Sequence, residues 1–575
     1  MVPAAGVRSS STHRLIKKKR KEDRRIAYFS MEIGIDTKIP TYSGGLGVLA
    51  GDTIRSCADL NVPTVAVTLL YKKGYFSQTF DTNGQQIESP YEWEPKSILT
   101  LLPEKVSVTI EGRMVYIQAW MYELYGVSDY FVPVLFLDTD IEENAHEDRS
   151  LTHYLYGGDQ RYRLAQEIIL GIGGVRMLKK LEYNNITRYH MNEGHASLLS
   201  LELLRQRKLE EASAWDIDGV KKKCLFTTHT PVPAGHDQFS YDLVKQLLGD
   251  FVPSELFLSL GGQEKLNMTY LALNLSDYIN GVAKQHGKVS TEMFPGYYID
   301  SITNGVHSGT WVCQSFKELY DRYIPGWMND PFSLRYALSI PAEEVWDAHQ
   351  KAKNNLIEYI NSKYQAQLAQ DVLTIGFARR ATAYKRADLV FSDINRLCDI
   401  ARRVGKMQFV FAGKAHPNDW PGKELIKKIF SFAQQFKDCV KITYLTEYDM
   451  TLAKMLIPGV DLWLNTPRRP KEASGTSGMK AAHNGVPSLS ILDGWWIEGC
   501  IEDITGWAIG PAGEVNLSDQ QEADFLYQKL ENVVIQAFYN NRQHWIDIMR
   551  SAIAINASFF NTHRMVQQYV LRAYL

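Results

Sequence analysis

The sequence contains no run of 18 or more apolar residues, so no segment is predicted to span a membrane as a helix. Its N-terminus lacks the apolar stretch of a secretory signal peptide. A net charge of -2 provides no basic surplus for a nucleic-acid backbone. No Cys-x-x-Cys pair occurs among the six cysteines, which favours reduced thiols in a cytoplasmic protein over a disulfide framework or a zinc site. We therefore expect a cytoplasmic protein whose partners are neither membranes nor nucleic acids.

What the chain does have is length and an ordinary globular composition. Its 575 residues are too many for one hydrophobic core and predict two large domains or three. Apolar residues make up 45% and charged residues 22%, as in soluble globular proteins. The basic run 13–25 has two open interpretations, a solvated tail and an arm that touches a polyanion. We take residues 1–25 as a basic mobile tail.

Short apolar runs alternate with helical patterns that carry charges on one face. The runs that fit buried strands are 25–31, 64–71, 131–137, 224–228, 373–377, 408–412, 440–445, 460–464 and 488–492. The helical patterns include 160–181, 342–364 and 425–436. Such alternation predicts parallel sheets of the α/β class. We expect two doubly wound, Rossmann-like domains facing each other across a deep cleft, with ligands at the carboxyl ends of strands.

The turn-rich stretch 302–311 is the predicted boundary between the two sets of strands. It divides the folded chain into an N-terminal α/β domain, 26–305, and a C-terminal α/β domain, 306–545. Apolar residues at helical spacing predict a C-terminal helical segment over 546–575.

A glycine motif, Ser43-Gly-Gly-Leu-Gly-Val-Leu-Ala50, opens the first helical pattern. It contains the Gly-x-Gly-x-x-Ala string of dinucleotide sites, but the strand before it ends too early, and no acidic residue follows about 20 positions later. Backbone amides without side chains at a helix N-terminus can still bind an anion. An anion site and a merely tight turn are both open at this motif.

A second small-residue motif is Lys471-Glu-Ala-Ser-Gly-Thr-Ser-Gly-Met-Lys480, after the predicted strand 460–464. Its amides can cradle a phosphate group while the amine of Lys480 waits nearby. This is the arrangement that a phosphorylated aldehyde cofactor needs to form a Schiff base. A glycine-rich loop with a surface lysine is the other interpretation.

Four cations lie within eight residues directly after the predicted strand 373–377, at positions 379, 380, 385 and 386. A solvated charge run is the usual explanation for such a cluster. The carboxyl end of a strand should face the cleft, however, so Arg380 and Lys385 are candidates for binding a free phosphate dianion.

Polar residues also follow strands of the first domain. His229 lies in a loop after a predicted strand, and the segment His190-Met-Asn-Glu-Gly-His195 precedes a helix. The two histidines of that segment are spaced one residue too far for a zincin helix, so we expect no metal. Recognition of sugar hydroxyls stays open for His229 and for Glu193.

Together these segments resemble the glycogen (α-glucan) phosphorylase family, over most of residues 26–575 and most closely its short prokaryotic branch. The string Glu472-Ala-Ser-Gly-Thr-x-x-Met-Lys480 is similar to the cofactor-lysine signature of that family. The resemblance implies that Lys480 carries pyridoxal 5'-phosphate. The residues it places around the cofactor are Gly475, Thr476, Ser477, Arg379, Tyr448 and Trp311.

The resemblance also implies the substrate contacts. Arg380 and Lys385 match positions that bind the substrate phosphate, and Gly44 and Gly45 match a loop that approaches it. The positions matching those that hold the glucosyl unit are Asn304, His229, Glu472 and Ser474, to which we add Glu193. As catalytic residues we take Lys480, Arg380, Lys385 and His229.

The implied activity is reversible phosphorolysis of a terminal α-1,4-linked glucose of glycogen, starch or maltodextrin to glucose 1-phosphate, with retention of configuration. The implied architecture is that of the GT-B glycosyltransferases, and a homodimer is a further expectation from the family. Control by phosphorylation or by a nucleotide is not expected in the short branch. A nucleotide-sugar glucosyltransferase such as glycogen synthase and a glucan-binding scaffold are the alternatives.

Overall fold

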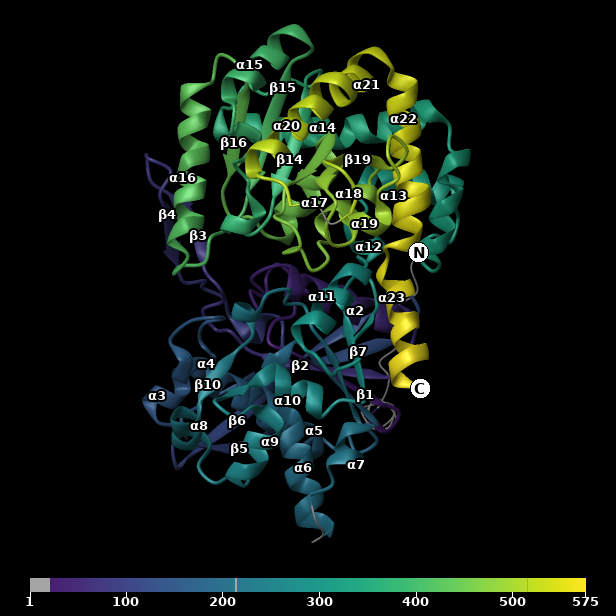
Figure 1. Cartoon of the computed structure of the whole chain (residues 1–575). Helices are drawn as coiled ribbons and strands as arrows, with labels where there is room; N and C mark the ends of the chain where they lie inside the picture. The colour runs from purple at the N-terminus through teal and green to yellow at the C-terminus, as the bar shows by residue number, and fades with distance from the viewer. Residues whose placement is uncertain (1–20, 212–214, 514–515) are drawn as a thin grey trace.

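The computed structural model describes residues 21–211, 215–513 and 516–575, folded into an N-terminal half and a C-terminal half that lie one above the other (Figure 1). Residues 1–20, most of the predicted basic tail, lie outside the described residues. Arg24 belongs to that predicted tail but is buried, and its guanidinium donates to the carbonyls of Thr64 and Phe131 at 3.1 and 2.6 Å. The folded part therefore begins before the predicted boundary at residue 25.

The N-terminal half is built on a nine-stranded sheet with the order β13-β12-β9-β8-β1-β2-β7-β6-β5. Counted from β7, the seven parallel strands follow the order 3-2-1-4-5-6-7, which is the doubly wound order extended by β13, and the order reverses between β1 and β8. The long strands β5 and β6 add an antiparallel edge. The strands are β1 Ile26–Ser30, β2 Thr64–Leu69, β5 Thr100–Ile110, β6 Arg113–Tyr125, β7 Phe131–Asp138, β8 Arg188–Asn192, β9 Cys224–Thr227, β12 Tyr278–Gly281 and β13 Asp300–Ser301.

The C-terminal half is built on a six-stranded parallel sheet with the order β16-β15-β14-β17-β18-β19. This again is the order 3-2-1-4-5-6, and the reversal lies between β14 and β17, which pair Ile375 with Leu462. The strands are β14 Leu373–Ala378, β15 Met407–Ala412, β16 Lys441–Leu445, β17 Leu462–Asn465, β18 Ser488–Ile491 and β19 Gly506–Ile509. The predicted α/β class with two doubly wound sheets is confirmed.

Helices cover both faces of each sheet, so the central strands β1, β2, β14 and β15 are buried along their whole length. The helices of the N-terminal half are α2 Gly45–Asp59, α3 His146–Arg149, α4 Gln160–Ile168, α5 Gly174–Lys180, α6 Leu198–Glu211, α7 Ile217–Lys221, α8 Tyr241–Leu248, α9 Ser254–Gly261, α10 Met268–Asn274 and α11 Lys284–Met293. Those of the C-terminal half are α12 Ser308–Trp311, α13 Gln314–Tyr323, α14 Ala342–Tyr364, α15 Ile394–Arg403, α16 Trp420–Gln435, α17 Met450–Gly459, α18 Ser477–Ala482, α19 Trp496–Gly499, α20 Asp519–Lys529, α21 Ile535–Asn540 and α22 Arg542–Ser551.

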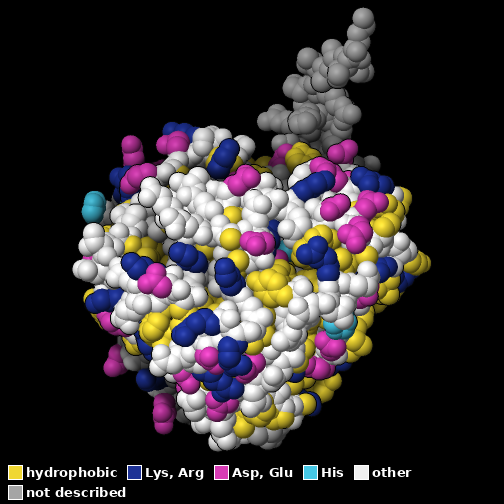
Figure 2. Space-filling view, turned by 90° about the horizontal axis from the view of Figure 1, so that it is seen from above, with side chains coloured by type: hydrophobic (Ala, Val, Ile, Leu, Met, Phe, Trp, Pro, Cys, Tyr) yellow, Lys and Arg dark blue, Asp and Glu magenta, His cyan; other side chains and the backbone are white. Residues whose placement is uncertain are grey.

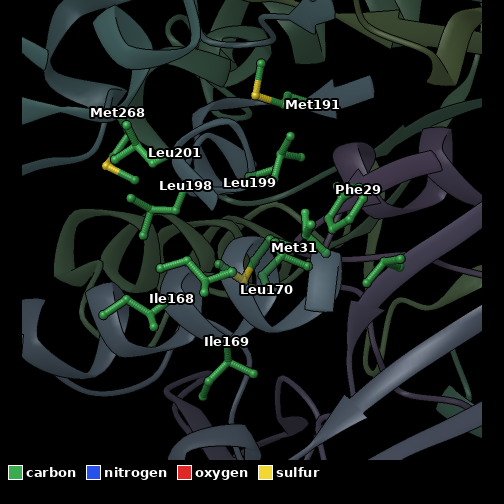
Figure 3. Close-up of a cluster of buried hydrophobic side chains, with 14 of the residues drawn as sticks. Phe29, Met31, Ile168, Ile169, Leu170, Met191, Leu198, Leu199, Leu201 and Met268 are labelled. Carbon is green, nitrogen blue, oxygen red and sulfur yellow. The ribbon is translucent and has the colours of Figure 1, made fainter. Parts of the chain in front are cut away.

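The single helix predicted over 160–181 is interrupted by a π-helical turn, η3 (Ile169–Gly173). Glycines allow the close packing of this turn, because a Cβ at Gly171 would lie 2.7 Å from the amide of Leu199. The side chains of η3 enter the main core of this half together with residues of β1 and α6 (Figure 3). The turn thus fixes α4 and α5 against the strand that ends at the switch point of the first sheet.

The predicted C-terminal segment 546–575 is shared between the halves. Ile546, Ile548 and Met549 of α22 pack in the core of the C-terminal half. The last helix, α23 (Thr562–Tyr569), runs down to the N-terminal half, where Val566 joins a core cluster beside α2 (Figure 1). The chain therefore crosses between the halves twice, near residue 306 and near residue 560, and a bridge pairs Val306 with Asn561.

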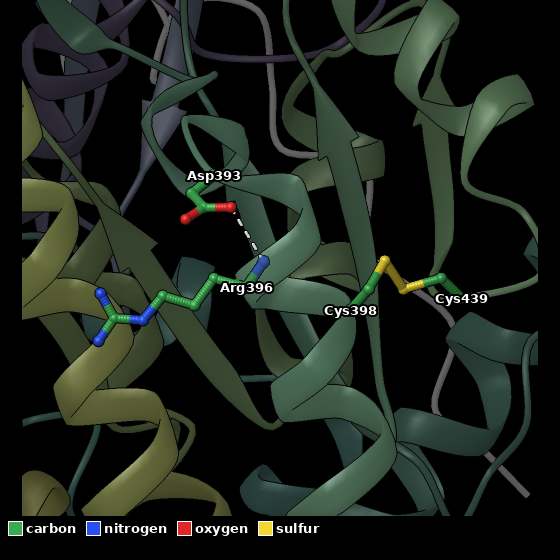
Figure 4. The surroundings of a disulfide bond; sticks show 4 residues. All are labelled: Asp393, Arg396, Cys398 and Cys439. Atoms are coloured by element: carbon green, nitrogen blue, oxygen red, sulfur yellow. Dashed lines mark hydrogen bonds between the residues drawn. A yellow bond between two sulfur atoms is a disulfide. The ribbon is translucent and has the colours of Figure 1, made fainter.

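A disulfide joins Cys398 of α15 to Cys439, which lies just before β16 (Figure 4). The expectation that all six cysteines are reduced thiols is therefore wrong for this pair, while four cysteines are free. The two residues are 41 positions apart, so no local spacing signalled the bond.

None of the helices in the described ranges combines the length and apolar character needed to cross a bilayer. On the face seen in Figure 2, Lys and Arg side chains are interspersed with Asp and Glu. That face offers no patch of one sign, in line with the small net charge.

Candidate active site

Lys480 lies in α18, directly behind the loop that follows β17, and its side chain is buried. Its Nζ makes no hydrogen bond to the described residues and lies 3.7 Å from the centroid of the Trp311 ring. Burial lowers the pKa of Lys480 to about 8, so about a tenth of the amine is unprotonated at pH 7, far more than for an exposed lysine. An unprotonated buried amine is the nucleophile that a carbonyl cofactor requires.

Trp311 connects Lys480 to the glycine motif. Its indole N–H donates to a carboxylate oxygen of Asp52 at 2.6 Å, and Asp52 is buried in α2, the helix that the glycine motif opens. The amide of His307 donates to the same oxygen at 3.2 Å. Asp52 therefore ties the N-terminal half to the lysine site, a role that we did not predict from the sequence.

The second cluster forms at the switch point of the C-terminal sheet. Arg379 follows β14, and its guanidinium donates to Asn465 at the end of β17 at 3.1 Å and to Glu472 at 2.6 Å. The Nζ of Lys385 donates to the same Glu472 oxygen at 2.6 Å. The structure thus brings three of the predicted residues together on one carboxylate oxygen.

Burial raises the pKa of Glu472, but the two cations outweigh burial and lower it to about 2. Beneath it, both carboxylate oxygens of Asp493 accept backbone amides, those of Glu472 and Gly494, each at 2.9 Å. Burial and the neighbouring Glu472 raise the pKa of Asp493 to about 7. Asp493 is a further site residue that no sequence signal singled out.

The other two cations of the cluster, Arg380 and Arg386, differ in their exposure and in their partners. Arg380 is exposed and makes no ion pair within the described part of the chain, so its charge stays available to a ligand. Arg386 instead pairs with Glu522 at 2.5 Å and donates to backbone carbonyls, which is a structural role. Tyr448 lies close enough to Arg379 for that cation to act on the phenol, although burial, the larger effect, raises its pKa.

The small-residue loop before Lys480 leaves polar atoms unused. The hydroxyl of Ser474 is buried without a partner in the described structure, as is the Nε of Arg379. Gly475 adopts a left-handed conformation, φ +75°, which glycine tolerates best. Thr476 precedes α18, and the hydroxyl of Ser477 accepts the indole N–H of Trp463 at 3.0 Å.

At the glycine motif, a buried carboxylate takes part of the predicted anion site. The amides of Ser43 and Gly44 donate to Glu32 at 2.6 and 3.3 Å, and Tyr156 donates to its other oxygen at 2.8 Å. The Gly44 amide therefore already has a partner within the protein, while the anion site and the tight turn both stay open. A Cβ added at Gly44 or Gly45 would still meet nothing within 4 Å, so both residues border open space.

At the switch point of the first sheet, Glu193 holds the loop of His229. Its carboxylate accepts the amide of His229 at 2.7 Å, the hydroxyl of Thr230 at 2.9 Å and its neighbour's amide at 3.0 Å. Glu193 is thus engaged by the protein, and its expected direct contact with substrate stays a prediction. The ring of His229 contacts Asn192 at 2.6 Å, and burial lowers its pKa to about 3, so it is neutral.

Asn304 lies in the first crossing between the halves. Its backbone amide donates to the carbonyl of Val282 at 3.0 Å. Its side-chain oxygen is buried without a partner among the described residues. A buried amide oxygen without a partner is costly unless a ligand or water satisfies it. This supports the predicted contact with a polar ligand.

One group of side chains in the described ranges has the make-up of a metal site, namely Asp59, His307 and His563. The amide of Thr310 donates to Nδ1 of His307 at 3.1 Å, so the ring proton sits on Nε2, 2.7 Å from Asp59. His563 contacts the same carboxylate oxygen at 2.9 Å. Because a metal would need the lone pair where His307 carries its proton, we interpret the group as a hydrogen-bonded clasp between α2, the first crossing and α23.

A family model described as carbohydrate phosphorylase matches residues 39–119 and 255–506. The chain is 41% identical to the maltodextrin phosphorylase of Thermococcus litoralis over 592 residues, which cover 96% of this chain and 70% of that protein. It is 35% identical to the glycogen phosphorylase of Aquifex aeolicus, with 96% and 86% covered. An uncharacterised protein of Methanocaldococcus jannaschii is 33% identical, with 95% and 99% covered. Since the model matches more than half of the residues and these relatives align along nearly the whole sequence, the chain belongs to the carbohydrate phosphorylase family.

Proposed function

We propose that the chain is a pyridoxal-phosphate-dependent α-glucan phosphorylase that releases terminal glucose from an α-1,4-glucan as glucose 1-phosphate. The observation that carries the proposal is the environment of Lys480, a buried amine with a lowered pKa against the Trp311 ring in a member of the carbohydrate phosphorylase family. A cytoplasmic location and a homodimer stay predictions.

The residues present fit the cofactor. Lys480 offers the amine for the aldehyde, and the partnerless Ser474 hydroxyl and Arg379 Nε lie in the two clusters that would surround it. Trp311 supplies an aromatic face, while Gly475, Thr476 and Ser477, at the start of α18, would offer backbone amides to a phosphate group. When bound, the cofactor supplies a phosphate group that exchanges a proton with the substrate phosphate.

The protein residues then have separable tasks. Arg380 and Lys385 bind the substrate phosphate and offset its repulsion from a second phosphate. Glu472 orients Lys385 and, when phosphate takes over that cation, is available to a sugar hydroxyl. Asn304 and neutral His229 hold the glucosyl unit by hydrogen bonds.

The substrate phosphate, held by these cations, protonates the glycosidic oxygen as the sugar acquires oxocarbenium character. It then attacks the anomeric carbon from the same face, so configuration is retained. No carboxylate nucleophile is needed, which separates this chemistry from that of the retaining glycosidases.

The first experiment combines a spectrum with an assay. We expect the purified protein to absorb in the near ultraviolet, borohydride to fix the chromophore on Lys480, and maltodextrin to yield glucose 1-phosphate only with phosphate present. A protein without the vitamin that transfers glucose from a nucleotide sugar would be a synthase-type enzyme instead. Glucan binding without glucose 1-phosphate release would indicate a scaffold.

Lys385→Ala tests the phosphate site separately. Loss of the Lys385 ammonium leaves the developing charge with one cation fewer, so we expect kcat/KM for phosphate to fall by about 100-fold or more. The matched control is Lys428→Ala, an exposed lysine of α16 paired with Asp388 at 2.7 Å, which should behave as wild type. Equal kinetics for the two variants would remove Lys385 from the site.

A further inference from the structure

Arg564, in α23, binds the backbone of the first crossing. Its guanidinium donates to the carbonyl of Thr303 at 2.6 Å, to that of Asn304 at 2.9 Å and, from Nε, to that of Phe559 at 2.9 Å. The remaining bond goes to the side-chain oxygen of Gln568 at 3.0 Å. No carboxylate of the described chain forms an ion pair with this cation. The fork of donors is therefore directed at two consecutive peptide groups.

These peptide groups are held from both sides. On one side, the amides of Ile302 and Asn304 donate to the carbonyls of Gly281 and Val282, at the end of β12, at 3.1 and 3.0 Å. On the other side lies α23, from which Arg564 donates to the carbonyl of Asn304. The backbone of Asn304 is fixed, whereas its side-chain oxygen is buried and has no partner in the described structure.

We propose that Arg564 is a positioning residue that sets the Asn304 side chain against the glucosyl unit of the substrate. The proposal rests on the proposed function, because Asn304 is assigned to the sugar there. Arg564 touches no reacting atom and acts through the two peptide groups that it clamps. The last helix of the chain thus contributes to a substrate site formed by the middle of the chain.

A lysine cannot replace this arginine geometrically. The planar guanidinium reaches two carbonyls at fixed angles, whereas an ammonium group concentrates its donors at one point. Burial lowers the pKa of Arg564 to about 10, so it remains a cation at neutral pH. Its side chain also forms part of the wall of a cavity of about 700 Å³. A small solute could enter that cavity and reach the position of a truncated side chain.

The test measures glucose 1-phosphate kinetics in the synthesis direction and phosphate kinetics in phosphorolysis. For Arg564→Ala we expect the KM for glucose 1-phosphate to rise and kcat/KM to fall by about 100-fold, as misplacement of one contact by about 1 Å can cause. The KM for phosphate should stay near that of wild type. Arg564→Lys should be little more active than Arg564→Ala. Added guanidinium should restore part of the activity of Arg564→Ala. The control, Arg572→Ala, removes an exposed arginine of the same C-terminal stretch that bonds Asp300 and Ser301, and should resemble wild type.

A double-mutant cycle with Asn304→Ala separates positioning from general stability. If Arg564 acts through Asn304, the double variant should lose little more activity than Asn304→Ala alone, and guanidinium should not rescue it. Losses that multiply, or Arg564→Ala kinetics equal to those of Arg572→Ala, would overturn the proposal. A wild-type protein that makes no glucose 1-phosphate would instead refute the proposed function, so the two failures are distinguishable.

Discussion

At the scale of single residues, two carboxylates in the C-terminal cluster have opposite electrostatic environments. Glu472 faces two cations, and its pKa falls to about 2. Asp493 is bonded only to backbone amides beneath Glu472, and burial raises its pKa to about 7. One carboxylate is thus ionised throughout the physiological range, and the other gains or loses its proton within it.

Asp493 should make stability depend on pH. Its folded-state pKa lies above that of an unfolded aspartate, about 4, so the folded chain holds an extra proton between about pH 4 and 7. Its stabilising contribution is complete below pH 4 and is lost as pH rises through 7, by about 1.4 kcal/mol per pH unit. Asp493→Asn cannot ionise, so we expect its free energy of unfolding, measured by urea titration, to rise relative to that of wild type between about pH 4 and 7. The control is Asp371→Asn, at an exposed position. If the free energies of unfolding of Asp493→Asn and wild type differed by the same amount at every pH, the assignment would be contradicted.

The sequence singled out the residues to which the proposed chemistry is assigned, but not the residues that hold them in place. Lys480, Lys385 and Arg379 stand in dense motifs directly after strands, where chemistry is expected. Asp52, Glu32 and Asp493 are isolated acidic residues, and their roles depend on contacts with distant segments. The bond from the Gly44 amide to Glu32 was not foreseen for the same reason, because no local pattern shows that Glu32 folds under the loop.

At the scale of elements, the apolar runs predicted most central strands within a few residues. The antiparallel strands β5 and β6 were missed, because their exposed and buried residues alternate and give no continuous apolar run. The π-helical turn was missed because its spacing of apolar residues still fits a helix. The disulfide depends on the packing of α15 beside the chain that enters β16, which only the tertiary fold determines.

The disulfide should stabilise the C-terminal sheet on its β15–β16 side. Closing a loop of 41 residues restricts the unfolded chain, which corresponds to about 2–4 kcal/mol. We expect the Cys398→Ser/Cys439→Ser variant to lose that much in free energy of unfolding under non-reducing conditions. Alkylation of denatured protein should modify four cysteines before reduction and six after it. Six modified cysteines in the unreduced protein would show that the bond does not form.

At the scale of the whole molecule, each half sends an element onto the other. The helix α23 carries the C-terminus onto the N-terminal half, and a hairpin of β3 (Ser77–Phe80) and β4 (Gln86–Ser89) reaches from the N-terminal half to α16 (Figure 1). Gln78 of this hairpin donates to the carbonyl of Gly413 at 2.8 Å, and Gln86 to that of Ala415 at 2.9 Å. These contacts connect the two halves at places other than the two crossings.

Phe80 is the apolar anchor of the hairpin, and its removal should weaken the connection between the halves. Its ring lies 4.9 Å from that of Phe430 and 5.5 Å from that of Tyr444, both in the C-terminal half. Losing two aromatic contacts and part of their buried area corresponds to about 2 kcal/mol. We expect Phe80→Ala to lower the free energy of unfolding by that amount and to speed hydrogen exchange in the hairpin and α16 together. Phe332→Ala, which removes an aromatic side chain that is 54% exposed, is the control. If the two variants were equally stable and exchange rose only within the hairpin, the hairpin would be an appendage rather than a connection, and α23 with the two crossings would alone hold the halves together.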